Sequence, residues 1–432
     1  MGGDQLYYFI VLISLFFIFY KFRNFLSFFI ILLFYDGLFA YYGSTVWNIY
    51  KFLLPFLAVF VAIRINAISK SKLLEHVKLI WIFLFFSLSF FLSSYLNNDY
   101  LTLILNQYSK YFLFFISFFI IKRFIIFRNE LDKQVKLILY LIIIQGILAV
   151  IKFFIFGVLE SLIGSVAYIG GAAGTVLPIL GFVFIWTIRK GKLSTKDWLI
   201  ILLLLFIGFG SMKRAIWFIM PVVVFMFIHY IPRKRLTKKN LIYIPVIFLI
   251  FYIGLRLNPT LNPQADYWGK FDPEFAYKYA KDYSMGSEEN YNEGTGRVGA
   301  TLNLFNSILH NSWDRKTLFG FGLKEMYVTT SAEFDGEKYG LNTKGSATGI
   351  IQTYISGGIT SILATLMLAG VLIFYVKNRR IRTTLLLIFL WEYLFYTGII
   401  LRTPALSFLL VFSIVYVNYQ SEKILLKEVE PE

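Results

Sequence analysis

The sequence contains no cysteine and only three histidines, His76, His229 and His310. The lack of cysteine excludes disulfides, thiolate metal sites and cysteine nucleophiles together. Because the three histidines lie far apart in the chain, a histidine-rich metal cluster is not expected. No phosphate-binding or dinucleotide-binding glycine motif is present either, so we expect no cofactor.

Charged residues are also scarce, at 16% of 432 residues, whereas 58% are hydrophobic. Soluble domains are nearer half apolar and a quarter charged. Long stretches without any charge, such as 79–92, 199–208 and 241–252, can be buried in a bilayer but not in one aqueous core. The sequence therefore predicts an all-α polytopic integral membrane protein with membrane lipid around it.

The apolar stretches predict about twelve or thirteen transmembrane helices, most of them near the length that crosses ~30 Å of hydrocarbon. No small-residue cleavage site follows the first stretch, so we expect it to be retained. The candidate spans are 6–20, 25–42, 46–63, 78–95, 101–121, 136–156, 175–188, 198–210, 215–231, 241–256, 346–376, 384–400 and 405–419.

Lysine and arginine collect in alternate loops between these spans. The loops that alternate with these basic loops, at 42–44, 97–99 and 158–164, have no positive charge. By the positive-inside rule the basic loops are cytoplasmic, which also accounts for the net charge of +17 without a nucleic-acid partner. The N-terminus is then outside and the C-terminus cytoplasmic. The basic loops are 21–23, 64–72, 122–133, 189–192, 233–239 and 377–382.

This topology divides the chain into N-terminal transmembrane helices (1–256), an extracytoplasmic, periplasmic loop (257–345), C-terminal transmembrane helices (346–419) and a cytoplasmic tail (420–432). The loop is polar and rich in tyrosine, and it is too long for a passive connection. Val298–Leu309 has Leu302, Phe305, Ile308 and Leu309 at spacings that predict one apolar helix face. We expect a folded cap that carries function.

Five cations lie at the predicted outer boundary, where the orientation rule does not explain them: Lys213, Arg214, Arg256, Arg297 and Arg402. Long cationic side chains at helix ends commonly extend to lipid headgroups. A phosphate-bearing ligand is the other explanation, since a planar guanidinium binds phosphate oxygens in a bidentate way.

Four motifs follow one another in the second half of the chain. Ser211 to Arg214 lie in GSMKRAIW, Gly296–Arg297 opens the predicted loop helix, LFGFG occupies 318–322, and a glycine pair is at 357–358. In this order the chain resembles the O-antigen ligase and polymerase family (WaaL-type ligases and Wzy-type polymerases). The ligases have a histidine at the outer start of the span that contains the glycine pair. This chain has Ala347–Thr348 there, so the polymerases are the better match.

The resemblance implies a glycosyltransferase of the bacterial inner (cytoplasmic) membrane that acts in lipopolysaccharide biosynthesis. Such an O-antigen polymerase transfers a glycan from undecaprenyl pyrophosphate to another lipid-linked repeat unit at the outer face, without metal or nucleotide. Its substrate partner is the undecaprenyl-pyrophosphate-linked oligosaccharide, and a chain-length regulator is an open second partner. The alternatives are an O-antigen ligase and a lipid-linked oligosaccharide flippase, although a transporter is expected to show internal repeats and short loops.

Residue roles follow from the resemblance and from the chemistry. Arg297 and Arg214 are expected to stabilise the leaving pyrophosphate, with Lys213, Arg402 and Arg256 as further phosphate-binding groups. Candidate general bases are Glu288, Glu289, Glu293, Asp266 and His310, although most loop carboxylates are solvated surface groups and a surface or structural role is the usual one for such a histidine. The aromatic rings of the loop either stack on sugars or form the cap's own core, and Trp268 and Trp313 are the candidates for substrate binding.

Overall fold

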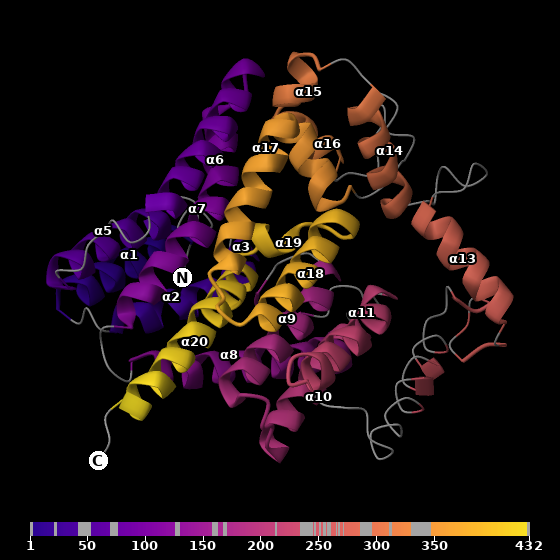
Figure 1. The fold of residues 1–432 in the computed structure, drawn as a ribbon, viewed down its shortest axis with the longest axis horizontal. Helices are drawn as coiled ribbons and strands as arrows, with labels where there is room; N and C mark the ends of the chain where they lie inside the picture. The colour runs from indigo at the N-terminus through magenta and orange to yellow at the C-terminus, as the bar shows by residue number, and fades with distance from the viewer. Residues whose placement is uncertain are drawn as a thin grey trace.

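The computed structural model is helical throughout its regular structure (Figure 1). It describes residues 3–20, 24–41, 53–69, 77–125, 130–157, 163–166, 171–211, 214–233, 245, 248–249, 252–253, 256, 261–264, 266, 268–270, 272–285, 296–310, 313–329 and 347–429.

Six helices of the described residues are long and apolar enough to cross a membrane. They are α6 (Val77–Leu96), α7 (Leu101–Phe124), α8 (Glu130–Phe156), α9 (Gly171–Arg189), α17 (Gly349–Phe374) and α20 (Pro404–Val429). Shorter apolar segments occur in α1 (Gly3–Phe19), α2 (Phe25–Phe34), α5 (Leu54–Ser69) and across α11 (Arg214–Phe225) and η4 (Met226–Tyr230). The chain is therefore a multi-pass helical membrane protein, and the larger count of twelve or thirteen spans stays a prediction.

Several predicted boundaries are wrong. The span predicted at 25–42 is divided at Tyr35 into α2 and α3 (Asp36–Tyr41). The span predicted at 384–400 ends early, as α18 (Arg379–Phe395), and a short α19 (Ile399–Arg402) follows. The chain leaves the helix at Tyr396, and Gly398 in the link has a left-handed conformation with φ of 64°, which glycine adopts without steric cost. Two further predictions are not contradicted: α20 continues beyond the predicted span 405–419 to Val429, within the predicted tail, and most of the predicted span 241–256 lies outside the described residues.

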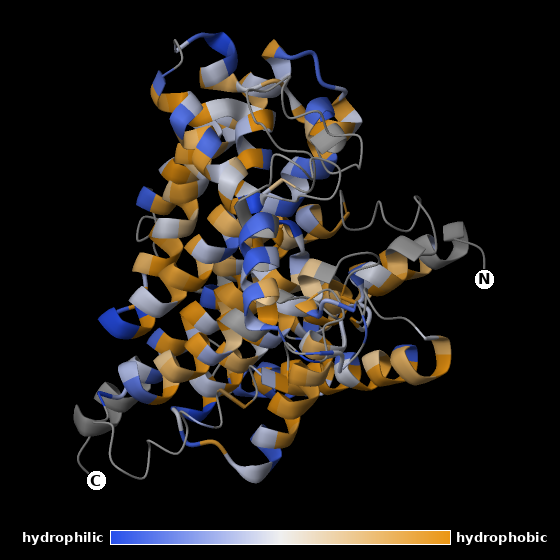
Figure 2. Cartoon of the chain, turned by 90° about the vertical axis from the view of Figure 1, so that its right-hand side faces the viewer, coloured by the Kyte–Doolittle hydropathy of each residue, from blue (hydrophilic) through white to orange (hydrophobic). Residues whose placement is uncertain are grey.

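Two helices form the centre of the bundle. Every residue of 173–187 in α9 and of 404–418 in α20 is buried. By contrast, α6 exposes Trp81, Leu84 and Leu88 on one helical face, which suits contact with lipid. Figure 2 shows hydrophobic residues along most of the helices.

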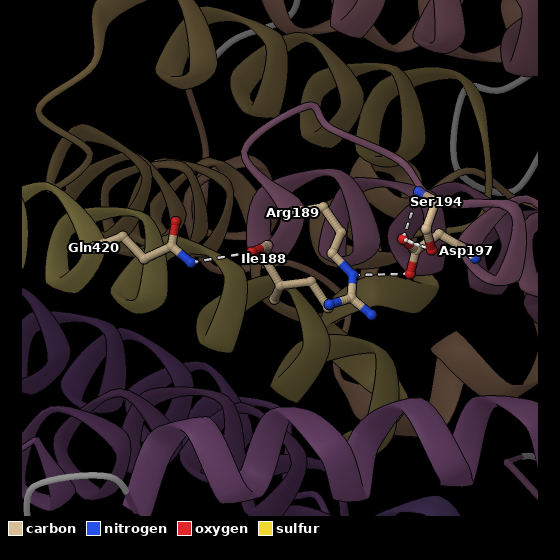
Figure 3. Close-up of polar contacts among 5 residues, drawn as sticks. All are labelled: Ile188, Arg189, Ser194, Asp197 and Gln420. Atoms are coloured by element: carbon tan, nitrogen blue, oxygen red, sulfur yellow. Dashed lines mark hydrogen bonds and ion pairs between the residues drawn. The ribbon is translucent and has the colours of Figure 1, made fainter.

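Contacts at each end of the bundle join segments predicted to lie on one side of the membrane. At the predicted cytoplasmic end, Tyr416 donates to Asp132 (2.8 Å) and Gln420 donates to the Ile188 carbonyl (3.2 Å; Figure 3). At the predicted outer end, Lys324 donates to the Asn98 carbonyl (2.6 Å). These contacts agree with the predicted pairing of loops.

The described part of 257–345 contains α13 (Pro273–Met285), α14 (Arg297–His310), α15 (Arg315–Phe319) and α16 (Leu323–Thr329). The helix predicted at 298–309 is confirmed by α14, but its predicted apolar face is not the buried one. Leu302, Phe305 and Leu309 are exposed, whereas Gly299, Ala300, Thr301 and Leu304 are buried. The small side chains let α14 come close enough for the Thr301 hydroxyl to donate to the Leu394 carbonyl of α18 (2.8 Å).

Candidate functional site

A backbone crossing joins the turn between α15 and α16 to the middle of α17. The N–H groups of Phe321 and Gly322 both donate to the Ile355 carbonyl, at 2.7 and 3.1 Å. Gly358 has φ of 64°, and a Cβ atom at this position would come within 2.6 Å of the Gly320 nitrogen. Only glycine fits such a crossing, because a side chain would meet backbone atoms that cannot rotate away. Two motifs of the sequence, LFGFG and the glycine pair, therefore form one packed unit.

The end of α6 fastens this unit to the membrane helices. The Ser93 hydroxyl hydrogen-bonds to the carbonyl of Phe319 and to that of Ser356 (2.8 Å), so it touches both sides of the crossing. The Asp99 carboxylate accepts the N–H groups of Leu323 (2.8 Å) and Lys324 (3.2 Å). Burial raises the pKa of Asp99, against the lowering effect of these two hydrogen bonds. The sequence predicted no role for Ser93 or Asp99, because the only distinguishing property of 97–99 was its lack of positive charge.

Arg297 is the first residue of α14 and lies over an aromatic ring. Its guanidinium carbon is 5.1 Å from the centroid of the Tyr396 ring. The Tyr396 hydroxyl donates to Thr175 of α9 (3.0 Å), and the Tyr396 carbonyl accepts the Gly349 N–H of α17 (3.1 Å). Arg297 is thus placed where α9, α17 and the link between α18 and α19 meet.

Arg402 reaches the same first turn of α17 from α19. Its guanidinium donates to the side-chain oxygen of Gln352, and the Gln352 amide donates to the Ala347 carbonyl (2.8 Å). The buried Glu392 carboxylate lies within electrostatic range of Arg402 and accepts the Ile399 N–H. Arg297 and Arg402 are therefore held by neighbouring residues of one helix junction. Both are among the cations predicted to bind phosphate.

The motif around Ser211 approaches this junction from the other side. Ser211 is the buried C-terminal cap of α10 (Thr195–Gly210), and a Cβ atom on Gly174 would meet its hydroxyl oxygen at 2.7 Å. Thr175, which follows Gly174 in α9, accepts a hydrogen bond from the hydroxyl of Tyr396, the residue whose ring lies against Arg297. Arg214 begins α11, but its side chain, like the whole of Lys213, lies outside what the structure describes.

The remaining predicted site residues do not join Arg297. His310 is exposed at the opposite end of α14, and its ring nitrogen Nδ1 is 2.8 Å from the Asn306 carbonyl. At a rise of about 1.5 Å per residue, the two ends of this helix are roughly 20 Å apart. Trp313 is exposed as well, and Glu293 lies outside the described residues.

Arg256 and Trp268 form a cluster of their own. The Arg256 guanidinium donates to the Trp268 carbonyl (2.7 Å) and lies 5.3 Å from the centroid of the Trp268 ring. The Trp268 N–H in turn donates to the Arg256 carbonyl (2.9 Å). With 53% of its surface exposed, Trp268 still has a ring surface available for a ligand.

The junction around Arg297 and Arg402 has the chemistry of an anion site. Guanidinium groups form strong, charge-assisted hydrogen bonds to phosphate oxygens. Sequence reasoning identified both arginines but missed Tyr396, Gln352 and Glu392, because they lie in or beside apolar stretches. The available signal was the presence of polar side chains within those stretches.

No protein-family model matches this chain, and no curated protein sequence matches it.

Proposed function

We propose that this protein is a polysaccharide polymerase that transfers a glycan from undecaprenyl pyrophosphate to another lipid-linked repeat unit at the outer face of a bacterial cytoplasmic membrane. The observation that carries the proposal is the meeting of separate motifs at one helix junction. Arg297 lies over Tyr396, Tyr396 bonds to Thr175, and the neighbouring Gly174 packs against Ser211.

In the proposed reaction, a hydroxyl oxygen of the acceptor sugar attacks the anomeric carbon of the donor. The bond between that carbon and the phosphate oxygen breaks, and the pyrophosphate leaves with the electron pair. The hydroxyl proton passes to a general base. Fixed cations favour this reaction because they stabilise the charge that develops on the leaving group.

We assign the pyrophosphate to Arg297 and Arg402, with Arg214 and Lys213 as further contacts by resemblance. Because His310 lies roughly 20 Å along α14 from Arg297, we assign the general base to a loop carboxylate such as Glu293. The exposed ring of Trp268, beside Arg256, is a second contact for sugar or phosphate.

The residue at 347 favours a polymerase over a ligase. Ala347 and Thr348 occupy the place where the ligases have histidine, and both side chains are buried. The Thr348 hydroxyl shares a hydrogen bond with Thr301 (3.1 Å), so this position packs α14 against α17. Neither side chain is a general base at neutral pH.

The test is the length of glycan made by cells that carry Arg297→Ala, Arg297→Lys or a control, Arg379→Ala, at matched membrane expression. Arg379 is an exposed cation of the predicted cytoplasmic loop. We expect Arg297→Ala to replace long glycan ladders by single repeat units, with a loss of rate on the order of 10²-fold or more. Arg297→Lys keeps the charge without the planar fork, and it should retain part of the activity.

Unchanged ladders in Arg297→Ala would show that the assignment of the site is wrong. Accumulation of single lipid-linked units in the cytoplasmic leaflet would instead indicate a flippase. If repeat units polymerise normally but are not attached to their final acceptor, the protein is a ligase.

A further inference from the structure

A cavity of about 330 Å³ lies among α5, α6 and α7, away from the junction of Arg297 and Arg402. Phe83 of α6 and Phe115 of α7 stack in its wall, with ring centroids 3.8 Å apart. The segments that line it are the first half of α6 and the last half of α7, next to the loops predicted to be cytoplasmic. This site is therefore expected in the cytoplasmic leaflet, opposite to the proposed reaction.

The cavity is open toward the side of the bundle. Two of its lining residues, Ile63 of α5 and Leu84 of α6, are 64% and 50% exposed. Apolar side chains exposed on a membrane-spanning bundle face lipid acyl chains. An acyl chain therefore has a sideways path from the bilayer into an apolar slot of ligand size.

Arg123 is the charged residue in the lining. It is 7% exposed, and its Nη2 atom has no hydrogen-bond partner within the part of the chain that the structure describes. A buried guanidinium nitrogen without a partner is costly, because it has lost its hydration. The neighbouring Lys122 has a different environment, with its ammonium group 4.9 Å from the centroid of the Tyr375 ring. Arg123 thus supplies one positive charge at an otherwise apolar cavity.

We propose that this cavity binds an anionic phospholipid of the cytoplasmic leaflet, with one acyl chain among α5, α6 and α7 and its phosphate on Arg123. The apolar walls fit the chain, and the buried guanidinium complements the anionic headgroup. A zwitterionic phospholipid carries a compensating positive charge and is expected to bind less well. This inference is independent of the proposed glycosyl transfer.

The test is native mass spectrometry of the purified full-length protein with an equimolar mixture of phosphatidylglycerol and phosphatidylcholine. We expect the wild type to retain phosphatidylglycerol preferentially and Arg123→Gln to lower that preference roughly tenfold or more. Arg123→Lys should retain part of it. The control, Arg379→Gln, removes an exposed cation from the same predicted side and should leave the preference unchanged.

A second variant, Ala62→Phe, fills the cavity while Arg123 remains. It should reduce binding of phosphatidylglycerol without changing the melting temperature measured in the absence of lipid. This variant decides the matter if Arg123→Gln does not fold. Equal lipid preference in Arg123→Gln and Arg379→Gln overturns the proposal, as does full lipid retention by Ala62→Phe. Displacement of the lipid by inorganic phosphate alone would identify a site for a small anion and not for a lipid.

Discussion

Arg189, at one end of the helical bundle, is held differently from Arg297 and Arg402 at the other end. At the predicted cytoplasmic end, Arg189 Nε is 2.9 Å from a carboxylate oxygen of Asp197, whose other oxygen accepts the N–H (2.9 Å) and hydroxyl (2.6 Å) of Ser194 (Figure 3). At the predicted outer end, Arg297 lies over the Tyr396 ring and Arg402 donates to the Gln352 amide. A carboxylate in direct contact neutralises a guanidinium, whereas a ring face or an amide oxygen holds it without neutralising it. Glu392 acts on Arg402 electrostatically and not through a direct ion pair. The first arrangement, which we call the structural lock, is an ion pair that stabilises the fold. The second leaves the positive charge able to bind an anion.

Packing differs between the ends as well. The cytoplasmic end is joined by side chains, such as Asn418, whose amide donates to the Tyr375 carbonyl (2.7 Å). The outer end is joined by a close approach of backbones at Gly320 and Gly358. Side-chain contacts tolerate small shifts, but a crossing of backbones has no atoms that can rotate out of the way. The outer end should therefore be the more sensitive of the two to a single added methyl group.

The largest effect is expected for Gly358→Ala. The new methyl group must occupy a left-handed backbone position and clash with Leu318, which costs roughly 2–5 kcal/mol of unfolding free energy. The matched control is Gly370→Ala in the same helix, where a Cβ atom meets nothing within 4 Å. This control should be neutral or stabilising by up to about 1 kcal/mol. Melting temperatures in detergent measure both, and equal values would show that the crossing does not hold the outer end.

A smaller effect is expected for Asp197→Ala, which removes the buried carboxylate from Arg189 and from the cap of α10. We expect a loss of roughly 2 kcal/mol of unfolding free energy, because the partners lose charge-assisted hydrogen bonds. Lys133→Met is the control, since Lys133 is the exposed member of a looser pair with Glu130 (3.6 Å). It should change stability by no more than about 0.5 kcal/mol. Equal effects of the two substitutions on the melting temperature in detergent would contradict the structural lock.

The smallest effect is a difference in pH dependence between two aspartates, one at each end. Burial raises the pKa of Asp197, which precedes the predicted span 198–210, but hydrogen bonds from Ser194 and Arg189 outweigh burial and leave the pKa lowered. The contribution of Asp197 to stability is present above about pH 3.9, which is the ordinary pKa of an aspartate in the unfolded chain. It is lost as the pH falls through the lower pKa that Asp197 has in the folded protein.

Asp99 has a raised pKa because of burial, so its ionisation changes the stability with pH in the opposite direction from that of Asp197. Above about pH 3.9 the unfolded state loses this proton first, and stability therefore falls as the pH rises through the folded value. Melting curves at a series of pH values should show that Asp197→Asn weakens the loss of stability in acid. Asp99→Asn should remove the fall in stability that occurs as the pH rises through the pKa of Asp99 in the folded protein. Identical profiles for the two variants would refute the assigned difference between the ends.

Local chemistry in the sequence was enough for the class of protein and for much of the helix pattern. Long uncharged stretches predict spanning helices because each residue's transfer into lipid depends mainly on that residue. The helix at Val298–Leu309 also followed from nearby residues alone, whereas Gly357 and Gly358 were singled out by the family resemblance.

Only the tertiary structure decided which residues meet. Arg297 lies over Tyr396, far along the chain, and Arg402 reaches Gln352 across two helices. The buried face of α14 consists of Gly299, Ala300, Thr301 and Leu304 in place of the larger apolar residues, because small side chains let α14 approach α18 closely. Such contacts depend on how the helices fit together, and no local periodicity encodes that fit.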